Sequence, residues 1–258
     1  MAGGMRCRWP SKVSRNRTVA VCLAGLLGQS ACSPRVEAPM AESSPGSPAS
    51  PLPDLGSDAV VCGEPGDRVG TDESVAALAG CNIYRGDAIS LSSAVTDLSP
   101  LASLRVIEGS LESPGFNADL ETLEGLEQLQ SVGEFTFSRD GLRRVSGVSN
   151  LYEVKGHFKL FSLANLTDLD GLENLQSTGT LDVMINPVLT NIDGLSGLQR
   201  VDGDLRIEGN PELMELDGLK RLERVTGDLY IQGNPKVPSS EIDRLLERVA
   251  VDGEIHVD

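Results

Sequence analysis

The chain has 258 residues, of which 40% are hydrophobic and only 3% aromatic, so any core must be built from leucine, valine and isoleucine. Its formal charge is −16, which argues against a nucleic-acid partner because no cationic field is present to neutralise phosphates. Two histidines and five cysteines leave little material for a metal centre or acid–base catalysis, and 28 glycines with 14 prolines indicate a turn-rich chain.

Residues 1–31 are typical of a secretory signal peptide. Five basic side chains precede an apolar run over 19–28, and no acidic residue occurs before Cys32. Ten apolar residues rise only about 15 Å as a helix, half of the hydrocarbon core of a bilayer. A permanent membrane span is therefore not expected here.

The end of this segment, Ser30-Ala31-Cys32, resembles the lipobox of bacterial lipoproteins, with Gln29 standing where leucine is usual. The resemblance implies that Cys32 becomes the diacylated first residue of the mature protein. Because Ser33 rather than aspartate follows the cysteine, it also implies sorting to the outer membrane of the bacterial cell envelope. The alternative is ordinary cleavage near Ala31, which would leave Cys32 as a spare thiol.

The number of cysteines favours the lipoprotein. Cys7 and Cys22 lie in the signal, so the exported chain keeps Cys32, Cys62 and Cys81, an odd number. If Cys32 carries lipid, Cys62 and Cys81 remain as a pair, and a disulfide is expected in an oxidising compartment. The lipid would also supply the membrane attachment that an acidic protein surface cannot provide.

Residues 32–57 are predicted to form a disordered tether. Six prolines are interleaved with serine and alanine, and no aromatic residue is present. Such a composition cannot bury enough apolar surface to order itself. The folded domain is therefore expected over residues 58–258.

A repeat of 23–24 residues organises this domain. One series of glycines falls at 86, 109, 133, 156, 179, 203, 227 and 253, and a second at 125, 147, 171, 194 and 218. Apolar and polar residues alternate after each glycine of the first series, which is typical of a strand with one buried face. About eight such repeats predict a mainly β fold, a right-handed β-helix or leucine-rich-repeat-like solenoid with short capping helices at both ends.

Local motifs predict how the repeats turn and how the stack is closed. Asn186, Asn210 and Asn234 each precede a proline, 24 residues apart, and are expected to form a ladder whose amides satisfy backbone groups in the bend. A helix is predicted from Thr71 to Leu78. A second helix is expected to open with a capping box of Ser240 and Asp243 and to be followed by a last strand over 254–257.

The entry segment between Cys62 and Cys81, the Gly-x-Leu-x-Ile strands and the Leu-x-x-Leu-x-Gly-Leu linkers resemble the receptor L-domain over roughly residues 60–258. The resemblance implies a β-helical ligand-binding module that recognises its partner through its sheet and loops without catalysis. The family has no fixed binding motif, so no binding residue is carried over from it.

The outward positions of the predicted strands form two rows across the sheet. One contains Glu134, His157, Thr180, Asp204, Asp228 and Glu254, and the other contains Thr136, Lys159, Asp182, Arg206, Tyr230 and His256. The simpler interpretation is a solvated face with a cross-strand ion pair between Asp182 and Arg206. The functional interpretation is a polar binding surface with the candidate contacts Lys159, Asp182, Arg206, Tyr230, Asp204 and Asp228, among which tyrosine and arginine are typical hot-spot residues.

The sequence contains no recognisable catalytic or metal-binding motif. His157 and His256 are expected about 20 Å apart, too far to share a metal or a proton, and no nucleophile elbow or phosphate loop occurs. We therefore expect a non-enzymatic, lipid-anchored envelope protein, without cofactor or metal, that recognises a protein or glycan. Two alternatives stay open: a polysaccharide-active β-helix enzyme that uses Asp182 and Arg206, and a passive envelope scaffold.

Overall fold

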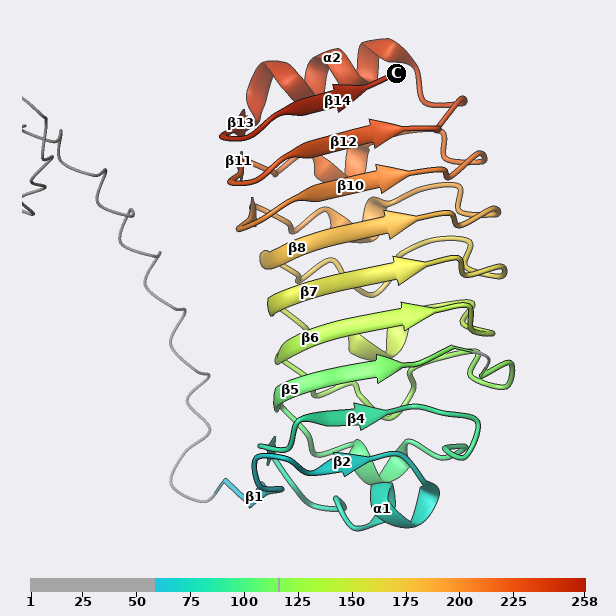
Figure 1. The fold of residues 1–258 in the computed structure, drawn as a ribbon, viewed down its shortest axis with the longest axis vertical. Helices are drawn as coiled ribbons and strands as arrows, with labels where there is room; N and C mark the ends of the chain where they lie inside the picture. The colour runs from blue at the N-terminus through green and yellow to red at the C-terminus, as the bar shows by residue number, and fades with distance from the viewer. Residues whose placement is uncertain (1–58, 116) are drawn as a thin grey trace, which may run out of the picture. The chain divides into compact units, whose positions relative to one another are not determined.

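The computed structural model of the chain describes residues 59–115 and 117–258. The predicted signal peptide, the tether and Cys32 lie outside these residues. The described part is mainly β, and its strands belong to one 14-stranded sheet whose pairings are all parallel. The predicted mainly β class is confirmed (Figure 1).

The strands differ in length between the two halves of this sheet. In chain order they are β1 (Val61–Cys62), β2 (Arg68–Val69), β3 (Ile83–Tyr84), β4 (Ala88–Ser90), β5 (Val106–Ser113), β6 (Ser131–Ser138), β7 (Glu153–Phe161), β8 (Ser177–Met184), β9 (Arg200–Val201), β10 (Leu205–Glu208), β11 (Arg224–Val225), β12 (Leu229–Gln232), β13 (Ala250–Val251) and β14 (Ile255–Val257). The long strands β5 to β8 span positions that two short strands occupy in the other repeats.

Strands that neighbour each other in the sheet come from consecutive repeats of the chain. The longest path runs β1-β3-β5-β6-β7-β8-β10-β12-β14, and the glycine period reappears as the register between strands. Leu205 pairs with Leu181 on one side and with Leu229 on the other, 24 residues away in each case. One sequence period therefore equals one step across the sheet.

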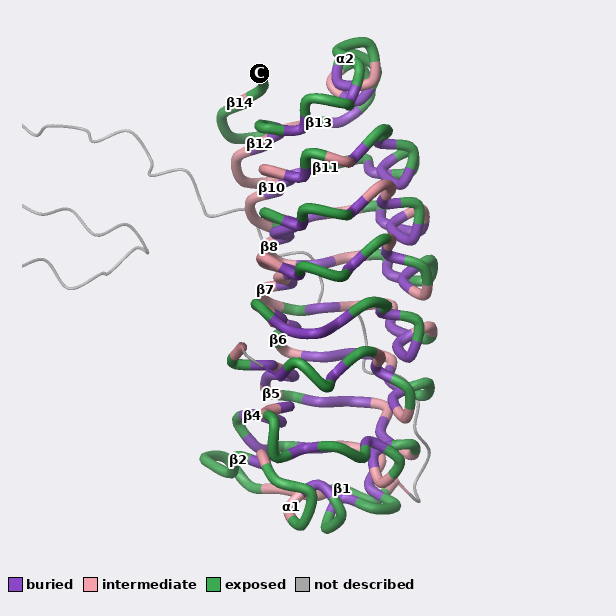
Figure 2. The backbone as a smooth tube through the Cα atoms, turned by 90° about the vertical axis from the view of Figure 1, so that its right-hand side faces the viewer, coloured by how far each residue is buried: buried purple, intermediate pink, exposed green. Residues whose placement is uncertain are grey.

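A return segment connects each repeat to the next and covers the inner face of the sheet. Four of these segments contain a 3₁₀ helix: η1 (Ser99–Leu101), η2 (Ser146–Val148), η3 (Asp193–Leu195) and η4 (Asp217–Leu219). The core lies between these segments and the sheet, and buried residues line both sides of it (Figure 2), with Leu219 on a return segment and Leu229 on a strand both fully buried. A side chain at Gly218 would clash with the carbonyl oxygen of Ile192, so close packing of return segments explains the second glycine series.

The N-terminal end of the sheet is held by a short helix and a disulfide. Helix α1 (Asp72–Ala76) has a capping box between Thr71 and Ser74 and ends two residues before the expected Leu78. The Asp72 carboxylate accepts hydrogen bonds from the backbone N–H and the hydroxyl of Thr96 in the next repeat. The predicted Cys62–Cys81 disulfide is confirmed.

Helix α2 (Ser239–Arg248) covers the C-terminal end of the core with Ile242 and Leu245, and its C-cap Val249 is also buried. The predicted capping box was wrong: Pro238 is the N-cap, and no side chain caps the helix. Proline has a fixed φ that suits the residue before a helix, so the helix begins one residue earlier than Ser240. Within residues 59–115 and 117–258, no helix is long and apolar enough to cross a bilayer.

Candidate functional site

The strand pairings bring the second predicted row together on the outward face of the sheet. Thr136, Lys159, Asp182, Arg206, Tyr230 and His256 are consecutive register partners on β6, β7, β8, β10, β12 and β14. Inward neighbours of these residues, such as Val183 and Ile207, are fully buried. Strict alternation along each strand therefore places the row opposite the core.

Asp182 lies at the centre of a charged network on this face. Its carboxylate is 2.7 Å from Nε2 of His157 and 3.5 Å from a guanidinium nitrogen of Arg206. Arg206 also contacts the carboxylate of Asp204 at 2.5 Å. The simpler sequence interpretation was a solvated face with an Asp182–Arg206 pair, but Asp182 is only 5% exposed because side chains from both neighbouring strands cover it.

The C-terminal end of the row is an aromatic stack. The rings of Tyr230 and His256 lie 4.4 Å apart and nearly parallel, and the guanidinium of Arg206 lies 5.1 Å from the centroid of the Tyr230 ring. The Tyr230 hydroxyl donates a hydrogen bond of 3.1 Å to Asp228. This bond, first among several causes, raises the pKa of Tyr230, because the phenol is held as a donor to a carboxylate.

The candidate acids Asp204 and Asp228 also support the backbone. The Asp204 carboxylate accepts the N–H of Asp228, and the Asp228 carboxylate accepts the N–H of Glu254. The bond from Glu254 is the largest cause that lowers the pKa of Asp228, followed by the bond from Tyr230. The two acids thus fasten successive repeats to one another, a role that the sequence analysis did not predict.

A third outward row follows the second at the end of each strand. Ser138, Phe161, Met184 and Glu208 are register partners in this row, followed by Gln232. The Lys159 ammonium lies 5.0 Å from the centroid of the Phe161 ring. Extending the alternation by two residues would have found this row, and with it the partly exposed Phe161 and Met184.

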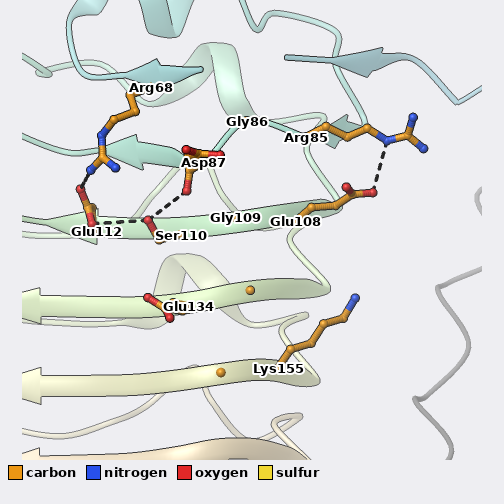
Figure 3. A pocket seen from close by; sticks show the side chains of 12 residues that line it. Arg68, Arg85, Gly86, Asp87, Glu108, Gly109, Ser110, Glu112, Glu134 and Lys155 are labelled. Carbon is orange, nitrogen blue, oxygen red and sulfur yellow. Dashed lines mark hydrogen bonds and ion pairs between the residues drawn. The ribbon is translucent and has the colours of Figure 1, made fainter. Parts of the chain in front are cut away.

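An open groove of about 690 Å³ crosses the N-terminal half of the sheet (Figure 3). Glycines of the first series, including Gly109 and Gly133, form its floor, next to register shifts in the pairings β5–β6 and β6–β7. Most of its charged lining is already paired, with Arg68 on Glu112 and Arg85 on Glu108. The register shifts in the β5–β6 and β6–β7 pairings were not predicted from the sequence.

The asparagine ladder has the expected hydrogen bonds. The side-chain oxygens of Asn186, Asn210 and Asn234 accept the N–H groups of Leu163, Asn186 and Asn210, and their amides donate to strand carbonyls. Asp140 accepts the N–H of Asn117 at the same position of an earlier repeat. Asn117 donates to the carbonyl of Leu91, so it is a further member that the sequence did not reveal, because no proline follows it.

Among residues 59–115 and 117–258, no group of three or more histidine, cysteine or acidic side chains is placed to hold a metal ion. His157 bonds to Asp182, but among the hydrogen bonds of the described residues none joins His157 to a hydroxyl or thiol. The outward face holds fixed charges and stacked rings.

In comparisons with known proteins, no family model matches the chain and no curated sequence matches it.

Proposed function

We propose that the chain is a lipid-anchored protein of the bacterial cell envelope that recognises a protein or glycan without catalysis. In this proposal, the repeats form a right-handed solenoid of the receptor L-domain type, anchored to the outer membrane through Cys32. Three features support the solenoid: the parallel pairing of successive strands, the return segments, and the helices at both ends. Right-handed crossovers between parallel strands are the strong physical preference.

The observation that carries the recognition role is the row from Lys159 to His256. It combines fixed cations, a shielded carboxylate and an aromatic stack on one outward face. Such side chains are held by their neighbours before any ligand arrives, so binding would cost little side-chain entropy. Arginine and tyrosine at the centre of such a surface are the residue types that contribute most to affinity.

Recognition is favoured over polysaccharide cleavage because of how the acids are engaged. Glycoside hydrolysis needs two carboxyl groups that can exchange protons or attack the sugar. Asp204 and Asp228 instead accept backbone N–H groups, and Arg206 or Tyr230 binds their other oxygens. Breaking these bonds would loosen the junctions between repeats.

The anchor is tested with the full chain in a bacterial host. Cys32→Ala should abolish labelling by a palmitate analogue and release the protein from membranes, whereas Cys22→Ala, within the predicted signal, should leave both unchanged. Membrane attachment that persists in Cys32→Ala would contradict the lipid anchor.

The recognition role is tested by screening the immobilised full chain against a glycan array and envelope extracts. A ligand of the sheet face should bind at least about tenfold more weakly to Arg206→Ala and Tyr230→Ala, because each removes a central contact. Lys220→Ala, which removes an exposed cation on a return segment, is the matched control. Turnover of a polysaccharide would favour the enzyme instead, and the absence of any saturable ligand would favour a passive scaffold.

A further inference from the structure

One backbone position is left-handed in five successive repeats. It comes directly after the strand and before the ladder residue, and it is occupied by Arg139, Ser162, Ile185, Gly209 and Gly233, with φ between 54° and 66°. The neighbouring repeat imposes this conformation. The N–H of Ile185 donates to the carbonyl of Glu208 at 2.8 Å, while the next residue, Asn186, turns inward into the ladder.

Ile185 is poorly suited to this position. A β-branched side chain is strongly disfavoured in the left-handed region, and the next two repeats have glycine there. The isoleucine is also 49% exposed, so it gains only part of the benefit of burial. Fold stability therefore does not account for the residue, and strain of this kind is typical of sites of contact.

Three exposed apolar side chains, including Ile185, lie on the corners that follow β8 and β10. Seven large apolar residues of the described part are exposed, and four of them lie in the terminal segments, at Val60, Val61, Ile255 and Val257. The other three are Ile185, Val188 and Met214, which we call the corner patch. The corners of β8 and β10 lie side by side, since the N–H of Met214 donates to the carbonyl of Thr190.

The sheet face extends the corner patch with further apolar surface. Met184 directly precedes Ile185 and pairs in register with Phe161, and both are partly exposed. Methionine side chains are flexible and polarisable, so they adapt to the shape of an apolar partner. Exposed apolar surface of this kind within a charged surface marks an interaction site.

Charge indicates what kind of partner would bind. Glu208 and Glu215 flank the corner patch, and neither makes an ion pair or side-chain hydrogen bond within residues 59–115 and 117–258. Anionic lipid headgroups would be repelled by these carboxylates, whereas lysine or arginine would be attracted. A polypeptide can present apolar side chains with lysine or arginine next to them, so it matches both the apolar and the charged part of this surface.

We propose that the corner patch of Ile185, Val188 and Met214 is a docking site for a segment of another protein that carries apolar side chains flanked by lysine or arginine. The corner patch lies outside the row from Lys159 to His256 that carries the proposed recognition role, and it borders Met184 and Phe161 of the third outward row. Whether the corner patch binds a partner therefore does not depend on which ligand binds to the row from Lys159 to His256.

The test uses the full chain and a displayed library of random 12-residue peptides. Selection on the wild type, with counter-selection on Ile185→Gly, should enrich peptides that combine apolar and basic residues. An enriched peptide should bind at least tenfold more weakly to Ile185→Gly and to Met214→Gln in fluorescence anisotropy titrations. Ser162→Gly changes the same corner position one repeat earlier, without removing an apolar side chain, and should bind as the wild type does.

Thermal unfolding separates contact from structure. Because glycine relieves the left-handed strain, Ile185→Gly should unfold at no lower temperature than the wild type while it loses the peptide. No enrichment, enrichment of acidic peptides, equal binding by Ile185→Gly, or equal loss in Ser162→Gly would overturn the proposal. Self-association in sedimentation, or binding to anionic vesicles, that Ile185→Gly abolishes would identify a different occupant and would overturn it as well.

Discussion

The two halves of the sheet satisfy the same backbone requirement by different means. In the C-terminal half, Asn186, Asn210 and Asn234 repeat one set of hydrogen bonds at intervals of 24 residues. In the N-terminal half, Asn117 and Asp140 occupy the ladder position, and the Cys62–Cys81 disulfide fastens the first strands. The C-terminal half, with the same asparagine at each ladder position, has regular corners. The N-terminal half, with Asn117 and Asp140 at these positions, has bulged strands and a disulfide.

The difference shows where support between repeats comes from. Each ladder amide bridges to the next repeat, so the regular half should behave as a chain of coupled neighbours. The first repeats have a neighbour on one side only, and the disulfide and the bond from Thr96 to Asp72 strengthen their attachment. Changes to the ladder and to the disulfide should therefore act on different regions.

The largest effect is expected from Asn210→Ala. The substitution leaves the buried N–H of Asn186 without a partner, and it removes the hydrogen bonds from the Asn210 amide to the carbonyl of Val183 and from the Asn186 amide to the Asn210 side-chain oxygen. An unsatisfied buried group costs about 1–3 kcal/mol and each of the two other lost hydrogen bonds about 1 kcal/mol, so the free energy of unfolding should fall by about 3–5 kcal/mol. Urea unfolding measures it, and Asn165→Ala, at an exposed asparagine, is the control. A loss no larger than in the control would show that the ladder does not support the fold.

A smaller and more local effect is expected from removing the disulfide in a Cys62→Ala, Cys81→Ala double variant. A crosslink over 19 residues contributes about 3 kcal/mol by restricting the unfolded chain. The loss should appear as faster amide hydrogen exchange in β1 to β4, with β10 and β12 unchanged. Equal acceleration along the whole sheet would mean that the two halves unfold as one unit.

Much of the regular half could be predicted from the sequence because identical residues recur at identical spacing. The glycine series gave the strand register, and Asn210 and Asn234 gave the ladder. The groove could not be predicted, because a bulge depends on how two neighbouring strands fit together. The burial of Asp182 was also missed, since it results from the diagonal reach of His157 and the contact with Arg206.

The smallest effect concerns the charge at Asp140, the acidic member of the ladder. Burial is the main cause that raises the pKa of Asp140 in the folded protein. The protonated carboxyl therefore stabilises the folded state at pH values below the ordinary aspartate pKa of about 4. This contribution to stability is lost as the pH rises through the raised pKa of Asp140 in the folded protein. As the pH rises through this range, the free energy of unfolding should decline less in Asp140→Asn than in the wild type. The difference between the two proteins should be less than about 1 kcal/mol.

Asp72→Asn is the control for this pH series, because Asp72 should change stability with pH in the opposite direction. The backbone N–H of Thr96 is the main cause that lowers the pKa of Asp72, so its contribution is present at neutral pH and lost on acidification. Urea unfolding from pH 3 to pH 7 measures both variants. If Asp140→Asn has the same pH dependence as the wild type, the buried carboxyl does not titrate differently in the folded state.

Residue-resolved hydrogen exchange on Asn210→Ala tests most directly whether each repeat is held by its neighbours. Protection should fall in β8, β10 and β12, whose repeats share hydrogen bonds with residue 210, while β3 and β5 keep theirs. Protection that falls equally in every strand, or only at residue 210 itself, would contradict this.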